Sequence, residues 1–205
     1  MSEDTDPEAV RSALLAVAES CRDEAGRLGV VVPPIDVAIR FVEPGGEYVR
    51  TDRRRRVEVA VSSSAQFLPP PEGANLVYGT CHEVGHLVVA TVVAPHPAPP
   101  VVWDESLAHV LAVDRFLPVV AERHGDGLWP MPYPDYADRE VAATRLDGDE
   151  GAFGYRSLLE RQTAQLRALI ARRDLPTLLA AVADAARTAP RAEDWLWKVR
   201  SRALR

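Results

Sequence analysis

The feature that most restricts the fold is one strongly apolar stretch that carries two histidines and a glutamate. Residues 74–93 place Leu, Val, Ala and Thr around much of a helical circumference, and a helix that is apolar on most sides is normally buried. Prolines stand on both sides of the stretch, so the sequence predicts a core helix there. Buried polar side chains need partners, which makes His82, Glu83 and His86 the residues to explain.

The two histidines have the spacing of a metal site. Because they are four positions apart, both imidazoles leave the same face of a helix, about 40° apart around its axis. One Zn²⁺ can take both nitrogens at about 2.0–2.1 Å. Glu83 lies beside the first histidine, where its carboxylate can reach a water on the metal rather than the metal. Residues 82–86 thus form the H-E-x-x-H signature of metalloproteases, with the glutamate as general base.

The alternative is a pair of ordinary histidines on a core helix. A metal would satisfy all three polar side chains at once, so we favour the metal interpretation. Gly85, inside the motif, costs up to about 1 kcal/mol relative to alanine in a helix. It also allows another backbone or a ligand to come close, which suits a site.

A catalytic zinc site needs a third protein ligand and an open position for water. The metzincin pattern H-E-x-x-H-x-x-G-x-x-H is excluded, because Val89 and Val92 stand where its glycine and third histidine would be. Eighteen residues separate His86 from Glu105, which lies in the segment W-D-E-S-L-A. Here the chain resembles the gluzincin metallopeptidases, whose aminopeptidase branch has H-E-x-x-H, eighteen residues and a glutamate within W-x-N-E-G-F-A.

This resemblance covers about 25 residues. It implies that His82, His86 and Glu105 are zinc ligands and that Glu83 is the base. The aminopeptidases also carry a G-x-M-E-N substrate loop before the zinc helix, and this chain has no such motif, so trimming of amino ends is not implied. Its small size is more similar to a minimal gluzincin core with a zincin-like fold.

Length and charge narrow the function further. The chain has 205 residues, 47% of them hydrophobic, which fits a single domain in which 1–102 holds the H-E-x-x-H helix and 103–205 the third ligand. A net charge of −6 argues against nucleic-acid binding. We find no run of 18 apolar residues, so we expect no membrane span. The acidic start lacks the features of a signal peptide, and we expect a cytoplasmic protein.

The pattern before the zinc helix predicts a helix and a small sheet. Residues 7–28 have helical apolar spacing, and Gly29 ends that helix. Residues 30–67 contain short alternating runs with turns between them, which predict a small antiparallel sheet. In gluzincins the strand bordering the cleft pairs with an extended peptide substrate, and 56–62 is the candidate for that strand.

After the zinc helix the chain is mostly helical, so the fold class is α+β. We expect a helix over 104–123 and three more over 155–173, 176–187 and 191–204. Glu105 lies in the first turn of the second helix. Three roles are open for His109, one turn further on: holding a ligand, binding substrate, or packing. Asp104 caps this helix or orients one of the histidines.

Hydrolysis at zinc also needs a donor to the oxyanion. In the aminopeptidase branch a tyrosine that opens a helix as Y-x-K-G has this role, and Tyr155 opens a helix in a roughly similar place. Tyr155 is therefore the first candidate, with His109 as the other side chain considered for the oxyanion. Further candidates, ranked after these two, are Tyr133, Tyr136 and His124. The alternative for a tyrosine at a helix start is simple packing.

The motif favours a zinc metallopeptidase or amide hydrolase that acts on a peptide or a peptide-like small molecule. In this mechanism Glu83 takes a proton from water and passes it to the leaving group. One alternative is a biosynthetic tailoring enzyme built on a peptidase-like core. The other is a non-catalytic protein stabilised by zinc, which the intact Glu83 disfavours because a structural site does not require it. The sequence indicates neither the substrate nor the oligomeric state.

Overall fold

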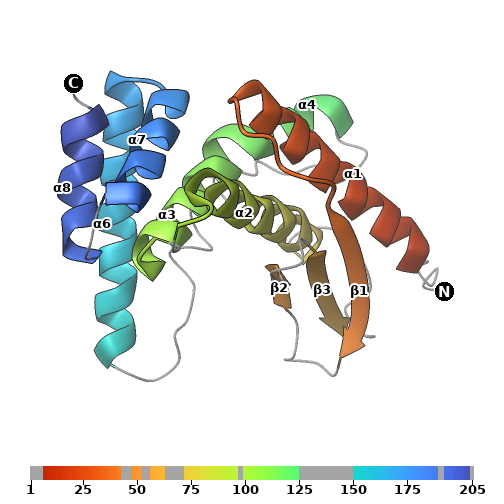
Figure 1. Cartoon of the computed structure of the whole chain (residues 1–205). Coiled ribbons are helices and arrows are strands. Elements are labelled where there is room, and N and C mark those ends of the chain that lie inside the picture. The colour runs from red at the N-terminus through yellow and green to blue at the C-terminus, as the bar shows by residue number, and fades with distance from the viewer. Residues whose placement is uncertain are drawn as a thin grey trace.

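The computed structural model describes residues 7–42, 48–51, 56–62, 72–96, 99–124, 150–188 and 192–203. Helix α2 (Glu72–Val93) lies at the centre, with a three-stranded sheet and α1 (Pro7–Arg27) on one side and the C-terminal helices on the other (Figure 1). The fold class is therefore α+β, as the sequence predicted. Within the described residues, most of the secondary structure is helical.

The sheet is mixed rather than antiparallel, which corrects the sequence-based expectation. Its strands are β1 (Asp36–Val42), β2 (Tyr48–Thr51) and β3 (Arg56–Ser62), in the spatial order β1-β3-β2. β3 runs parallel to β1 and antiparallel to β2. Short alternating runs do not reveal which strands pair, because period-two alternation is the same in both orientations.

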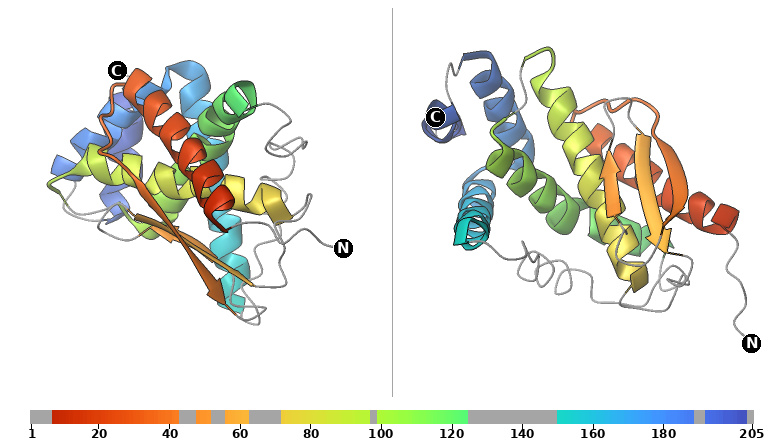
Figure 2. Two further views of the ribbon diagram at one scale, coloured as in Figure 1. Left: turned by 90° about the vertical axis from the view of Figure 1, so that its right-hand side faces the viewer. Right: turned by 90° about the horizontal axis from the view of Figure 1, so that it is seen from below.

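The strand order also overturns the expectation that residues 56–62 border the substrate. β3 is the central strand, and its backbone pairs with β1 on one side and β2 on the other. A strand paired on both sides has no free edge for a peptide. β2 is the edge strand that packs on α2, as the two views in Figure 2 show.

The core forms where the apolar faces of α1, α2 and the sheet meet. Val37, Val57 and Val59 from the sheet are fully buried, as are Leu14 and Val17 from α1. Gly29 ends α1 with φ of 83°, in the left-handed region that glycine tolerates best. These features confirm the predicted first helix and its glycine stop.

Helix α2 confirms the predicted buried helix and reaches its C-terminus at Val93, as expected. It contacts α1, α3, α7 and β2. Its segment Leu76–Val93 is long and apolar enough to cross a membrane, with a mean hydropathy of 1.3, but half of it is buried inside the protein. A central core helix passes the same test, and the packing on four sides fits that interpretation.

The helix expected over 104–123 is longer and interrupted. It consists of α3 (Val101–Leu111), a π-helical turn (Ala112–Phe116) and α4 (Leu117–His124). Pro118 follows the π-helical turn, and a proline cannot donate the backbone hydrogen bond that an α-helix requires. The remaining helices among the described residues are α6 (Glu150–Arg172), α7 (Leu175–Thr188) and α8 (Ala192–Ala203). α7 and α8 are close to their predicted bounds. α6 begins five residues before the predicted start at 155, so Tyr155 lies inside this helix and does not open it, which corrects the expectation.

Candidate metal centre

Three side chains predicted as ligands converge between α2 and α3. His82 Nε2 lies 3.1 Å from Glu105 Oε2 and 3.1 Å from His86 Nε2, and His86 Nε2 lies 3.6 Å from Glu105 Oε2. These three side chains form a group that could hold a metal ion. The helix supplies the two imidazoles, and the packing of α3 on α2 brings in the carboxylate.

The separations fit a small tetrahedral cation. Donors about 2.0–2.1 Å from a zinc ion in tetrahedral geometry are about 3.3–3.4 Å apart. The three observed separations of 3.1, 3.1 and 3.6 Å bracket that value. Two imidazole nitrogens and one carboxylate oxygen also match the donor set of many catalytic zinc sites. No large side-chain movement is needed to bring the three donors onto one ion.

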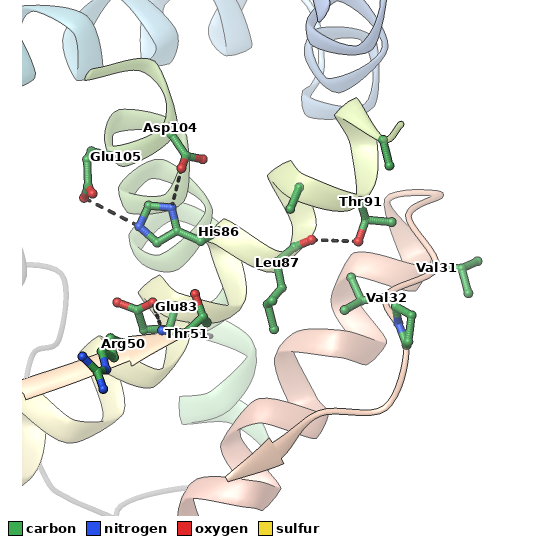
Figure 3. Close-up of a pocket in the computed structure, with 13 residues that line it drawn as sticks. Val31, Val32, Arg50, Thr51, Glu83, His86, Leu87, Thr91, Asp104 and Glu105 are labelled. Carbon is green, nitrogen blue, oxygen red and sulfur yellow. Dashed lines mark hydrogen bonds and ion pairs between the residues drawn. The ribbon is translucent and has the colours of Figure 1, made fainter. Parts of the chain in front are cut away.

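Asp104 supports His86 from the side opposite its Nε2. Asp104 Oδ2 lies 3.1 Å from His86 Nδ1 (Figure 3). His86 Nδ1 is buried and has no hydrogen-bond partner. We therefore treat its contact with Asp104 as an ion pair. Of the two roles expected for Asp104, orienting a histidine is the one that this contact supports.

The acidic neighbours set the proton affinity of His86. Burial lowers the pKa of His86, but the contacts with Asp104 and Glu105 outweigh burial and raise it to about 10. Burial raises the pKa of Glu105, but hydrogen bonds with His82 and His86 more than compensate and hold it well below its ordinary value. Without metal, the group is therefore an ion pair in which the proton on His86 takes the place of a cation.

A tyrosine that sequence reasoning missed supports His82. Tyr78 Oη lies 3.4 Å from His82 Nδ1 and 2.9 Å from His109 Nδ1. His109 is only 1% exposed, so it lies behind Tyr78 and reaches the ligand through the tyrosine hydroxyl. Spacing offered a signal for Tyr78, because it is four residues before His82 on the same helix and therefore on the same face.

Glu83 lies beside the triad, where the motif predicts the base. Its Oε2 accepts a hydrogen bond of 2.6 Å from the backbone N–H of Thr51, at the end of β2. Burial raises the pKa of Glu83 above its ordinary value, although the nearby charges of His86 and His82 and the Thr51 hydrogen bond lower it in part. The contact with Thr51 joins the edge strand to the metal centre, and sequence spacing carried no signal for it.

The metal centre opens into a hollow of about 800 Å³. Glu83, His86, Asp104 and Glu105 line one part of it, as Figure 3 shows, and the rest is largely apolar. A substrate in this hollow would therefore meet the three predicted functional carboxylates and one of the imidazoles together.

The other candidates have different surroundings. His109 does not line this hollow, and its position fits the ligand-supporting role among the three that the sequence left open. The side chain of Tyr155 in α6, and all of Tyr133 and Tyr136, lie outside the described residues, so a role for these tyrosines at the oxyanion stays a prediction. His124 Nε2 is 2.9 Å from Ser20 Oγ, where α4 meets α1.

The two cysteines are free and buried. Cys21 Sγ lies 3.6 Å from Cys81 Sγ, where α1 packs on α2 next to His82. Burial raises the pKa of the Cys21 thiol well above its ordinary value. Cys81 therefore packs as a small buried apolar residue, and the described structure contains no disulfide between the two.

Comparison with known proteins adds no relative. The chain matches none of the family models, none of the curated proteins and none of the solved structures against which it was compared. The geometry of the site itself therefore provides the basis for inferring its function.

Proposed function

We propose that this protein is a zinc-dependent hydrolase that cleaves an amide bond in a peptide or a peptide-like small molecule. One observation carries the proposal: His86 and Glu105 of the His82–His86–Glu105 group line the same hollow as the carboxylate of Glu83. Three protein donors around a small cation leave a fourth position for water or substrate, as in catalytic zinc sites. A structural site would be closed by four protein ligands, and among the described residues the group has three.

Zinc is the proposed metal because two imidazoles and a carboxylate at near-tetrahedral separations suit it best. When bound, zinc would lower the pKa of a coordinated water and polarise a carbonyl. His82, His86 and Glu105 would hold the ion. Asp104 would keep His86 oriented, and Tyr78 with His109 would do the same for His82.

Glu83 is the proposed general base. Its raised pKa makes the carboxylate a better proton acceptor than an exposed glutamate, and the Thr51 N–H holds Oε2 in place. The remaining oxygen, Oε1, is then the natural acceptor for the proton of an attacking water. Glu83 would afterwards donate that proton to the leaving amine.

The edge strand β2 supports a peptide-like substrate. The Thr51 N–H points to α2, away from β3, and in a strand residues two apart direct their backbone groups to the same side. Val49 therefore turns its N–H and C=O toward this outer edge of β2, on the side of α2, as well. An extended amide substrate could pair with that edge as an added strand.

The test combines metal analysis with turnover. We expect one zinc per chain in the unmodified protein and loss of that zinc in His86→Ala. His96→Ala is the matched control, because His96 lies on the exposed loop after α2 and should leave the metal content unchanged. Unchanged zinc in His86→Ala would disprove the ligand assignment.

Turnover is measured on a broad peptide library, with Glu83→Gln compared with Glu122→Gln. Glu83→Gln should retain zinc and lose at least about a hundredfold in rate, as general bases typically contribute. Glu122 is exposed on α4, and its variant should cleave normally. A fully active Glu83→Gln would remove Glu83 as the base. A zinc-loaded protein that cleaves neither these peptides nor any other amide would favour the tailoring-enzyme alternative.

A further inference from the structure

The face of α2 that lines the hollow changes character just beyond the metal ligands. Glu83 and His86 are followed on the same face by Leu87, Ala90 and Ala94. Ala90 and Ala94 are exposed, and their small side chains leave the hollow open along the C-terminal half of the helix. The charged side chains of the lining, which include Arg50 of β2 beside Glu83, thus lie at one end of the hollow, and the other end is apolar apart from Thr91 (Figure 3).

The opposite wall is apolar as well. It comes from the segment between α1 and β1, where Val31, Val32 and Pro33 line the hollow (Figure 3). Val31 is 82% exposed, which is unusual for a large apolar side chain in the described structure. Val32 is buried and anchors the segment in the core.

A second hollow of about 440 Å³ adjoins the first. Val31 and Thr91 line both hollows, so the two meet at these residues. Beyond them the second hollow extends to α7, where Leu179, Ala180 and Ala183 form its floor. Its lining includes no charged residue; Asp184 and Arg187, about one turn beyond Ala180 and Ala183 respectively on α7, form an ion pair with each other and do not line it.

Several backbone groups along this route are already paired. The N–H groups of Leu28, Gly29 and Val30 donate to carbonyls of α1, and the walls contributed by α2 and α7 are helical. A peptide backbone laid there would find few partners for its own amides, which is costly when they lose water. A hydrocarbon chain needs no such partners and gains from burial.

We propose that the substrate's amide carries a long hydrocarbon chain, which runs from the metal centre past Val31 and Thr91 into the hollow against α7. This inference rests on the proposed function, because it requires the amide to reach the metal. Within that function, the apolar route is the part of the site that selects the substrate. Its substrate class is an N-acyl or fatty-amide compound rather than a peptide of ordinary side chains.

The test uses straight-chain alkyl hydroxamates of increasing length as probes of the zinc-loaded protein. Their head group binds the metal, and their chains report on the apolar route. We expect the dissociation constant to fall about three- to fourfold for each added methylene until the second hollow is filled. Ala180→Trp should weaken the long probes at least tenfold and leave acetohydroxamate unaffected.

Thr177→Trp is the matched control, because Thr177 is exposed on the same helix but does not line the hollow. If the gain in affinity stopped at about four carbons, or if Ala180→Trp left that gain intact, the inference would be overturned. The proposed metal centre would not be affected by that result. If even acetohydroxamate failed to bind the unmodified protein, the metal-centred function itself would fail. Thermal unfolding of each variant checks that it folds.

Discussion

The α-carbon of Gly85 lies against the backbone of Ala108, where α2 crosses α3. A Cβ added to Gly85 would lie 2.8 Å from both Ala108 Cα and Ala108 O, which is too close for any side chain. The contact is backbone against backbone, so neither helix can yield by a side-chain rotation. Glu105 is one turn before Ala108, and this close crossing is what places its carboxylate 3.1 Å from His82 Nε2.

Gly85→Ala should therefore separate the two helices. We expect a loss of about 1–3 kcal/mol in the free energy of unfolding, as overpacked cores show, despite the better helix propensity of alanine. Zinc affinity should fall with it, because Glu105 moves with α3. Gly26→Ala is the control: nothing lies within 4 Å of its added Cβ, so that variant should be neutral or slightly more stable. Equal stability of the two variants would contradict this account.

Removing the hydroxyl of Tyr78 tests the support of His82. Tyr78→Phe leaves the ring in place but breaks the link of His82 Nδ1 to His109. We expect zinc affinity to fall about 10-fold, in the range found for lost ligand support, as measured by competition with a chelator. The double variant with His109→Gln should lose less than the sum of the two single losses, since both act through one network. Strict additivity would show that the two residues act separately.

Asp104→Asn tests the support of His86 in the same assay. Loss of the carboxylate 3.1 Å from His86 Nδ1 should weaken zinc binding about 10- to 100-fold. Asp114→Asn is the control, and Asp114 lies in the π-helical turn that follows α3. Asp114 binds Arg167 of α6 and lies outside the metal centre, so that variant should keep its zinc affinity. A similar loss in both variants would indicate a general structural effect instead.

Metal binding should release a proton from His86. In the metal-free protein its pKa is raised to about 10, so His86 is charged at neutral pH and must become neutral to bind zinc. Calorimetry in buffers of different ionisation enthalpy at about pH 8 should report about one proton released for each zinc bound. Heats that do not depend on the buffer would rule out this protonation state.

The same shift has a stability consequence with a defined sign. A raised pKa stabilises the folded state fully below the unfolded value of 6.5, and this contribution disappears as pH rises toward 10. The lowered pKa of Glu105 contributes above its ordinary value of 4.5 and is lost as pH falls. Metal-free protein should thus lose stability in denaturant titrations as the solution becomes alkaline.

Periodicity predicted the helices well, because the buried face of a helix appears in the sequence as apolar residues three and four positions apart. Gly29 as the end of α1 and the burial of α2 were predicted for the same reason. The sheet was harder. The sequence predicted its short strands. It did not predict that β1 pairs with β3, because no local pattern indicates which strands become neighbours. The π-helical turn before Pro118 was also missed, since its backbone depends on how the next turn packs.

The sequence by itself determined the donors: a helix with histidines at positions 82 and 86 must present both imidazoles on one face, because covalent geometry sets the helical pitch. Only the tertiary structure decided what surrounds them. The meeting of Glu105 with the histidines depends on the crossing of α2 and α3, and the hydrogen bond from Thr51 to Glu83 depends on which strand forms the edge. Such contacts arise when the whole core packs, so no short stretch of sequence encodes them.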